Sequence, residues 1–220
     1  MASIATHQSA QPLTAPRGAA IAGVIFSVLT IVGLGLVRYA VPADLTTPGV
    51  WLTEPSRRDA VRVALDLVPF AGIAFLWFIG VFRNRLGALE DQFFATIFLG
   101  SGLLFIASLF AAAAMTSALI ESVAAGNIGG EIYYFGRSAS DTLLNLFAMK
   151  MAGVFTISTC TIGVRTAILP PWVVGIGYGS ALLLLLVIAD WKWITLVFPL
   201  WMLLVSTQML IAEFRFRDAR

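Results

Sequence analysis

Two ionisable side chains, Asp66 and Lys150, lie inside stretches of this sequence that are otherwise apolar. Insertion scales put the cost of a charge at the centre of a membrane helix at about 2.5–3.5 kcal/mol, so such a charge usually serves a purpose. A carboxylate and an ammonium group that face each other across a bundle could form an ion pair, bind a small solute or relay a proton. These two residues are therefore the first candidates for a functional site.

The spacing of these charges allows them to meet, but it also allows simpler explanations. Asp66 lies six residues after the expected helix start at Ala60, and Lys150 lies seven after the one at Leu143. Both would then sit roughly 9–10 Å from the same membrane surface. Alternatively, Arg62 can neutralise Asp66 from one helical turn away, and the long stem of Lys150 can carry its ammonium group out to water. The sequence favours these structural interpretations over a solute or proton site.

Hydroxyl groups are dense beyond Lys150, where residues 156–161 read TISTCT. On a helix, Ser158 and Thr161 share one stripe with Lys150. Such a stripe either lines a polar cavity or lets two membrane helices approach closely, and the sequence favours close packing. The candidate ligand or ion-pair site predicted from sequence thus comprises Asp66, Lys150, Ser158, Thr161 and Arg62.

The residues of several common catalytic sites are missing. The one histidine, His7, stands in the polar N-terminal segment, which excludes an HExxH zinc site and a two-histidine haem. Gly100-Ser101-Gly102 lacks the spacing of a nucleophile elbow, and an aspartyl dyad would need a second buried acid beside Asp66. The single cysteine, Cys160, excludes an intrachain disulfide. The sequence therefore predicts no catalytic residue, no metal site and no cofactor.

The composition places these residues in a membrane protein. The 220 residues are 59% hydrophobic and 12% charged, whereas a soluble domain is about 25% charged. The net charge is only +2 with no basic block, so nucleic acid is not an expected partner. A membrane-spanning helix needs about 20 apolar residues. By that measure we predict an all-α polytopic helix bundle with about six transmembrane helices, at 19–41, 60–82, 93–118, 143–164, 172–189 and 194–212.

The expected organisation is one transmembrane domain with short tails. A flexible polar tail (1–18) precedes the six-helix domain (19–214), and a short basic tail (215–220) follows it. The first apolar run is too long for a signal-peptide core and ends at Arg38 without a cleavage site, so we expect it to be retained.

Two connections stand out by length. In residues 42–59 we expect Trp51 and Leu52 to rest at the membrane interface. In residues 119–142 we expect the third helix to continue, to break at Gly126–Gly130, and to be followed by a link that carries Tyr133 and Tyr134.

The orientation follows weakly from the cationic residues. With the N-terminus inside, seven arginines lie on the inner side, and five arginines and one lysine lie on the outer side. The short Arg83-Asn84-Arg85 turn and the arginine-rich C-terminus favour cytoplasmic N- and C-termini.

Three segments carry a resemblance to known sequences: WFIGVFRNRLGALEDQFFATIFLGSGLLF (77–105), MKMAGVFTISTCTIGVRTAILPPW (149–172) and ITLVFPLWMLLVS (194–206). With the Arg-x-Arg-x-Gly…Glu-Asp turn in the first of them, the chain resembles a group of uncharacterised bacterial, actinobacterial-type membrane proteins with six spans. The resemblance implies a bundle in the bacterial cytoplasmic (inner) membrane. It implies no activity.

Three classes of function fit these observations. The sequence favours a non-catalytic membrane component or scaffold, whose partners are the lipid bilayer, other membrane proteins or a second copy of the chain. The alternative is a transporter or ligand-binding protein for a small solute or protons, with an internal Asp66–Lys150 site and a polar cavity that opens toward 42–59 and 119–142. An intramembrane enzyme is the remote third hypothesis, because no catalytic constellation supports it.

Overall fold

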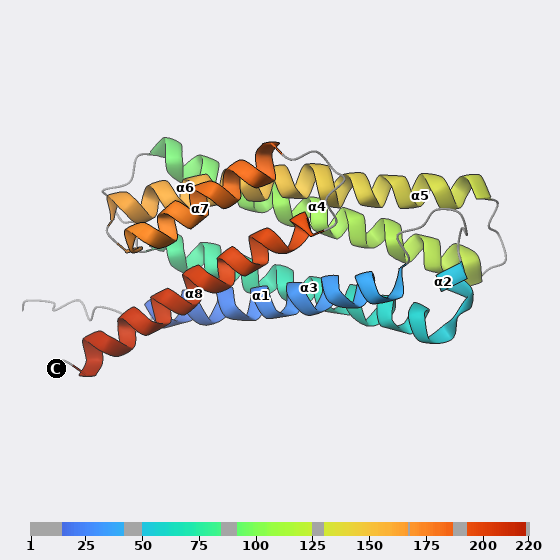
Figure 1. Ribbon diagram of the computed structural model, residues 1–220, viewed down its shortest axis with the longest axis horizontal. Helices are drawn as coiled ribbons and strands as arrows, with labels where there is room; N and C mark the ends of the chain where they lie inside the picture. Colours follow the sequence, from blue (N-terminus) through green and yellow to red (C-terminus); the bar gives the residue numbers. More distant parts are fainter. Residues whose placement is uncertain are drawn as a thin grey trace, which may run out of the picture.

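The structure is a computed structural model that describes residues 15–41, 50–84, 92–124, 130–166, 168–186 and 193–218. The regular elements within these ranges are all helices (Figure 1). The chain is therefore an all-α membrane helix bundle, as the sequence predicts. Its elements are α1 (Ala15–Ala40), α2 (Val50–Thr53), α3 (Pro55–Asn84), α4 (Gln92–Ala124), α5 (Gly130–Thr142), the π-helical segment η2 (Leu143–Ala148), α6 (Met149–Arg165), α7 (Pro171–Leu186) and α8 (Ile194–Asp218).

Within the described residues, five helical stretches are long and apolar enough to cross a bilayer: Arg17–Ala40, Pro55–Arg83, Phe93–Ser122, Gly130–Arg165 and Ile194–Phe214. The remaining expected span, 172–189, corresponds to α7, which has 16 residues. Residues 187–189 of that span lie outside the described part of the chain. At the helical rise, α7 is about 24 Å long and falls short of the ~30 Å hydrocarbon core.

The expected tails overlap with helices at both ends of the chain. Of the N-terminal tail, residues 1–14 lie outside the described part of the chain, and α1 already begins at Ala15. At the other end α8 continues to Asp218, into the segment expected as a basic tail.

The connection expected at 119–142 is largely helical. The continuation of the third helix is confirmed, because α4 extends to Ala124. The glycine-rich break falls mostly on residues 125–129, outside the described part of the chain. Residues 130–142, expected as a link, instead form α5, which continues through η2 into α6 as one stretch of 36 residues. A helix of that length is about 54 Å long, so a large part of it must extend beyond the ~30 Å apolar core.

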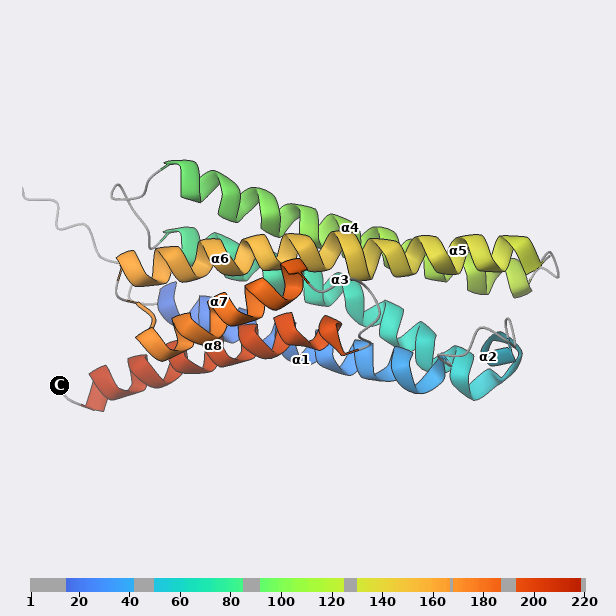
Figure 2. The ribbon, with the colours of Figure 1, turned by 45° about the horizontal axis from the view of Figure 1, so that its top comes forward.

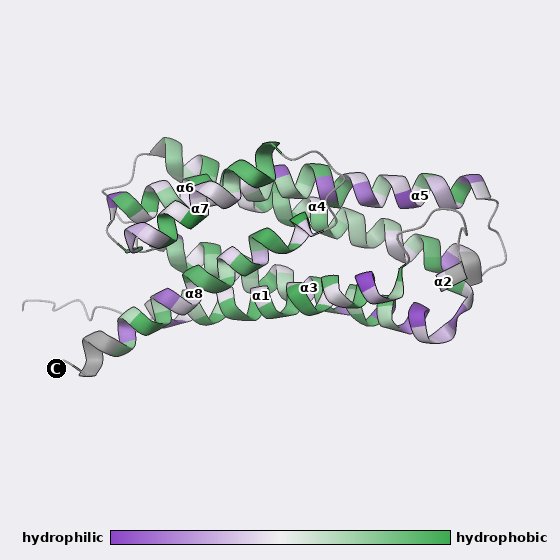
Figure 3. Ribbon diagram, viewed as in Figure 1, coloured by the Kyte–Doolittle hydropathy of each residue, from purple (hydrophilic) through white to green (hydrophobic). Residues whose placement is uncertain are grey.

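The extending part is α5, whose sequence GEIYYFGRSASDT is far more polar than that of α6. Figure 3 shows the same contrast, with hydrophilic residues gathered along α5 and at the start of α3. Figures 1 and 2 show that α7 and α8 flank only the half of the bundle that holds α6 and the C-terminus. In the other half, α2, the start of α3, the end of α4, and α5 surround the end of α1.

A cluster of phenylalanines holds the membrane half together. The rings of Phe75 and Phe155 lie 5.0 Å apart, and those of Phe98 and Phe155 lie 4.7 Å apart. Phe26 of α1 and Phe198 of α8 complete the contact between helices, with ring centroids 5.9 Å apart. All five side chains have no exposed surface. Association of helices inside lipid depends on packing rather than on the hydrophobic effect, so this cluster is the main source of specificity in the membrane half.

A second, smaller cluster lies at the far end and corrects one expectation. Trp51 and Leu52, expected at the membrane interface, are 3% and 1% exposed. They pack with Ala40, Ile120 and Tyr133. The short helix α2 turns both side chains inward, so they close the end of the bundle instead of facing lipid.

Close approach of α7 to its neighbours requires glycine at position 177. A Cβ atom there would overlap Sγ of Cys160 and lie 2.7 Å from Nε1 of Trp201. We predict that Gly177→Ala lowers stability by about 1–2 kcal/mol because these groups must move apart. Gly175→Ala and Gly179→Ala are the matched controls, since a Cβ at either position meets nothing within 4 Å. Thermal unfolding in detergent measures the difference; equal unfolding temperatures for all three variants would contradict the close packing.

Candidate functional site

A cavity of about 510 Å³ lies between α1, α3, α4 and α5, at the boundary between the two halves of the bundle. Its volume falls within the range of about 300–1,000 Å³ that is typical of sites for drug-sized ligands. Trp51 of α2 and Tyr133 of α5 line one end, and Leu29, Ala71 and Leu109 line the other. The cavity therefore lies toward the connections 42–59 and 119–142, where the ligand-binding hypothesis expects an opening.

Among the described residues, two cations and one anion line the cavity. Arg38 comes from the last turn of α1, and Arg137 and Asp141 are one turn apart on α5. Nε of Arg137 lies 3.7 Å from Oδ2 of Asp141, which is an ion pair beyond hydrogen-bond distance. Arg38 is also within electrostatic reach of this carboxylate. The described part of the wall therefore carries two positive charges and one negative charge.

Tyr133 connects the charged wall to the end of the bundle. Its hydroxyl oxygen accepts a hydrogen bond of 3.0 Å from Nε1 of Trp51 and another of 3.3 Å from Nη1 of Arg137. A phenol accepts two hydrogen bonds and donates one. Both lone pairs are used here, and the described residues provide no acceptor for the proton of Tyr133.

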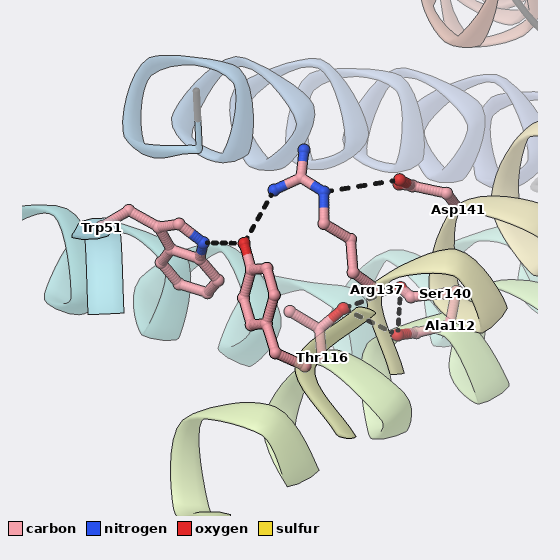
Figure 4. A network of polar contacts seen from close by, with 7 residues as sticks. Trp51, Ala112, Thr116, Arg137, Ser140 and Asp141 are labelled. Atoms are coloured by element: carbon pink, nitrogen blue, oxygen red, sulfur yellow. Dashed lines mark hydrogen bonds and ion pairs between the residues drawn. The ribbon is translucent and has the colours of Figure 1, made fainter. Parts of the chain in front are cut away.

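About one turn after Arg137, hydroxyl groups link α5 to α4. The Thr116 and Ser140 side-chain oxygens lie 2.8 Å apart, and each lies 2.9 Å from the carbonyl oxygen of Ala112 (Figure 4). Each hydroxyl has one proton, so two of these three contacts are hydrogen bonds at a time. This triangle, with Gly136 against Leu119, holds the cavity face of α5 in place.

Arg38 reaches across from α1 to the start of α8. Its Nη2 donates a 3.0 Å hydrogen bond to Oγ1 of Thr195, and its guanidinium carbon lies 5.4 Å from the ring centre of Trp193. Its Nε is buried and has no hydrogen-bond partner among the described residues. A buried donor without an acceptor costs about 1–3 kcal/mol, so Arg38 is poised to donate to an additional oxygen.

The π-helical segment η2 sits beside the deep part of the cavity. A π-turn contains an extra residue per turn and changes the direction in which later side chains point, and such turns are frequent at functional sites. Tyr133, Arg137, Asp141 and Leu144 recur every three or four residues and line the cavity. After η2, Lys150 instead points to α7.

Lys150 caps the C-terminus of α7. Its Nζ donates hydrogen bonds to the carbonyl oxygens of Leu184 and Leu185, at 3.1 and 2.6 Å. The last four carbonyls of a helix lack partners within the helix, and the partial negative charge there favours a cation. A positive charge therefore stands in the apolar run because a helix ends beside it.

Asp66 lies elsewhere, exposed on α3 beside Ala113 and Ser117 of α4. The expected equal depth of Asp66 and Lys150 is wrong, because the helices start earlier than expected. Asp66 lies level with Ala113 and Ser117 of α4. Thr116 of α4 meets Ser140, which is ten residues before Lys150 on the same continuous helical stretch. Ten residues amount to about 15 Å along the bundle. The structure does not pair the two residues.

The remaining sequence candidates also lie outside the cavity. The exposed Arg62 lies 3.7 Å from Asp59 rather than beside Asp66. Ser158 is 2% exposed and bonds the carbonyl of Val154 on its own helix. Thr161 bonds the carbonyl of Ile157, and its oxygen lies 3.0 Å from the Tyr178 hydroxyl of α7. These hydroxyls serve the contact between helices.

The residues that line the cavity were not singled out from sequence. The sequence pattern places Arg38 at the end of a span and Tyr133 and Arg137 in a link, and it assigns none of them to a site. One signal was available, because Tyr133, Arg137 and Asp141 are spaced by four residues and would share one face if 130–142 were helical.

The arrangement suits recognition of an anion. Guanidinium groups bind carboxylates and phosphates through paired, charge-assisted hydrogen bonds. Within the described ranges, no group of three histidine, cysteine, aspartate or glutamate side chains is arranged to hold a metal ion.

Comparisons with protein-family models, with curated proteins and with solved structures find no match to this chain.

Proposed function

We propose that this protein is a membrane-embedded binding protein that holds a small organic anion in the cavity between α1, α3, α4 and α5. The observation that carries the proposal is that guanidinium groups from two different helices, Arg38 and Arg137, face one partly apolar cavity whose described lining contains a single carboxylate, Asp141. The Tyr133 hydroxyl supplies a further donor at the same end.

The ligand-binding alternative from the sequence is thus retained with a different set of residues. The scaffold hypothesis specifies a dry bundle, and a cavity of about 510 Å³ argues against it. We further propose, from the resemblance and the distribution of arginines, that the protein resides in a bacterial cytoplasmic membrane with both termini in the cytoplasm.

Arg38 offers the decisive test. Protein in phosphatidylcholine nanodiscs is titrated calorimetrically with hexyl phosphate, hexanoate and hexyltrimethylammonium, which differ in head charge. We predict that at least one of the two anions binds and that the cation does not. Arg38→Met should weaken binding of that anion by about tenfold or more, because a hydrogen bond to a charged group contributes about 1.5–3 kcal/mol.

Arg62→Met is the matched control, since Arg62 is exposed and lies outside the cavity. It should leave the affinity unchanged. Unfolding temperatures of both variants verify that the fold is retained, and Arg38→Lys should restore part of the affinity by returning the charge. Equal binding of the cation, or unchanged anion binding in Arg38→Met, would refute the proposal.

A further inference from the structure

We propose that the ligand is a single-chain amphiphile that enters the cavity sideways from the bilayer, with a phosphate or carboxylate head at Arg38 and Arg137 and its alkyl chain directed toward the phenylalanine cluster. This inference rests on the proposed function, because it specifies the anion that the same cavity holds. Three features of the structure support it.

The first feature is a gradient of polarity along the cavity. The charged groups and Tyr133 lie at the end near α2, whereas Leu29, Ala71 and Leu109 line the other end. The polar residues Thr30 and Asn145, which also line the cavity away from α2, carry no charge. On α1, Arg38 and Leu29 are nine residues apart, which is about 13 Å of helix. A ligand that fills this space would have a charged head and an apolar body of similar length.

The second feature is the depth of the charged end relative to the membrane half. Arg38 bonds Thr195, in the first turn of α8. The ring of Trp193, immediately before α8, lies against the Arg38 guanidinium and is 59% exposed. Tryptophan is enriched at the depth of lipid headgroups. The head of an amphiphile resident in the bilayer would therefore meet Arg38 without leaving its normal depth.

The third feature is the direction in which the cavity opens. α1 packs chiefly against α3 and α8, and α5 packs against α4. α8 begins only at Ile194, so it covers α1 up to the level of Arg38 and no further. Asp141, on the face of α5 toward the cavity, is 59% exposed. For the described residues, this geometry points to an opening between α1 and α5 near the first turn of α8.

The deep end is closed. Ala71 and Leu109 belong to the same buried cluster as Phe75 and Phe105. The cavity thus has a finite depth, and an alkyl chain that enters from the charged end must stop there. The affinity should therefore increase with chain length only up to the length that fills the space.

A series of alkyl phosphates tests the inference. Inorganic phosphate and butyl, hexyl, octyl and decyl phosphate are titrated into the protein in phosphatidylcholine nanodiscs, with empty nanodiscs used to correct for partitioning. We expect inorganic phosphate to bind weakly and the affinity to rise roughly tenfold for every two added carbons before it levels off. The same series with alkyl carboxylates determines which head is preferred.

A filling variant separates the chain site from the head site. Ala113 lines the cavity, whereas the adjacent Ala114 is exposed and does not. Ala113→Leu should shift the levelling-off to a shorter chain and weaken octyl phosphate at least several-fold, while leaving butyl phosphate unchanged. Ala114→Leu should match the wild type. If Ala113→Leu unfolds, Gly33→Ala provides a milder filling variant, because its Cβ would meet only the Ala64 carbonyl oxygen, at 3.6 Å.

The outcomes distinguish this inference from the proposed function. If inorganic phosphate binds as tightly as octyl phosphate, and Arg38→Met weakens both, the ligand is a water-soluble anion; the amphiphile inference fails and the proposed function stands. If no member of either series binds, both fail. If affinity rises with chain length but Ala113→Leu changes nothing at any length, the chain binds outside the cavity and the inference is overturned.

Discussion

Replacing Phe155 with alanine is expected to lower the free energy of unfolding by about 3 kcal/mol. The ring has no exposed surface and lies at the centre of the phenylalanine cluster, with ring centroids at 4.7 Å to Phe98 and 5.0 Å to Phe75. Buried Phe→Ala changes cost about 3–5 kcal/mol in soluble proteins. We expect the lower end of that range, because the unfolded helices remain in a lipid-like medium and only the packing is lost.

Phe147→Ala is the matched control for this change. Phe147 lies two turns earlier on the same continuous helix, but its side chain is 52% exposed. It should change stability by less than about 0.5 kcal/mol, as surface substitutions usually do. Equilibrium unfolding in mixed micelles of increasing SDS content measures both variants. Similar losses at the two positions would show that the cluster does not hold the membrane half together.

The helical bundle itself could be predicted because its signal is local. Runs of about 20 apolar residues specify spanning helices whatever their neighbours are. The exception is α5, which has a polar sequence with Gly130 and Gly136 and therefore resembles a link. Its helical state depends on distant contacts, since Gly136 packs on Leu119 and Ser140 meets Thr116. Such contacts between segments are not visible in the sequence of either one.

The residues of the candidate site could not be identified from the sequence for the same reason. Arg38 and Arg137 face one cavity only because α5 is helical and the end of α1 lies level with α5. Each residue alone resembles an ordinary charge at the edge of an apolar run. By contrast, Asp66 and Lys150 attract attention because they interrupt apolar runs, yet Asp66 is exposed and Lys150 serves a helix end. A charged residue in an apolar run is easily noticed in the sequence. The sequence does not show which group in the fold that residue contacts.

The second prediction with a large expected effect concerns Lys150, which caps the C-terminus of α7. Lys150→Met is expected to lower stability by about 2–3 kcal/mol, because it removes two charge-assisted hydrogen bonds to the carbonyls of Leu184 and Leu185 and leaves both at the end of α7. Methionine preserves most of the side-chain volume, so the loss would report on the cap. The effect should be localised, and hydrogen exchange of the last turn of α7 should accelerate more than that of α6.

A double-mutant cycle with Asp66→Asn distinguishes the helix cap from an ion pair across the bundle. Residues that do not interact give additive effects within about 0.5 kcal/mol. Because Asp66 and Lys150 are separated by about 15 Å along the bundle, we expect additivity, with the single Asp66→Asn change nearly neutral at its exposed site. A coupling of more than about 1 kcal/mol would restore the Asp66–Lys150 pair. A neutral or stabilising Lys150→Met would instead show that the lysine extends to water and that α7 ends without its help.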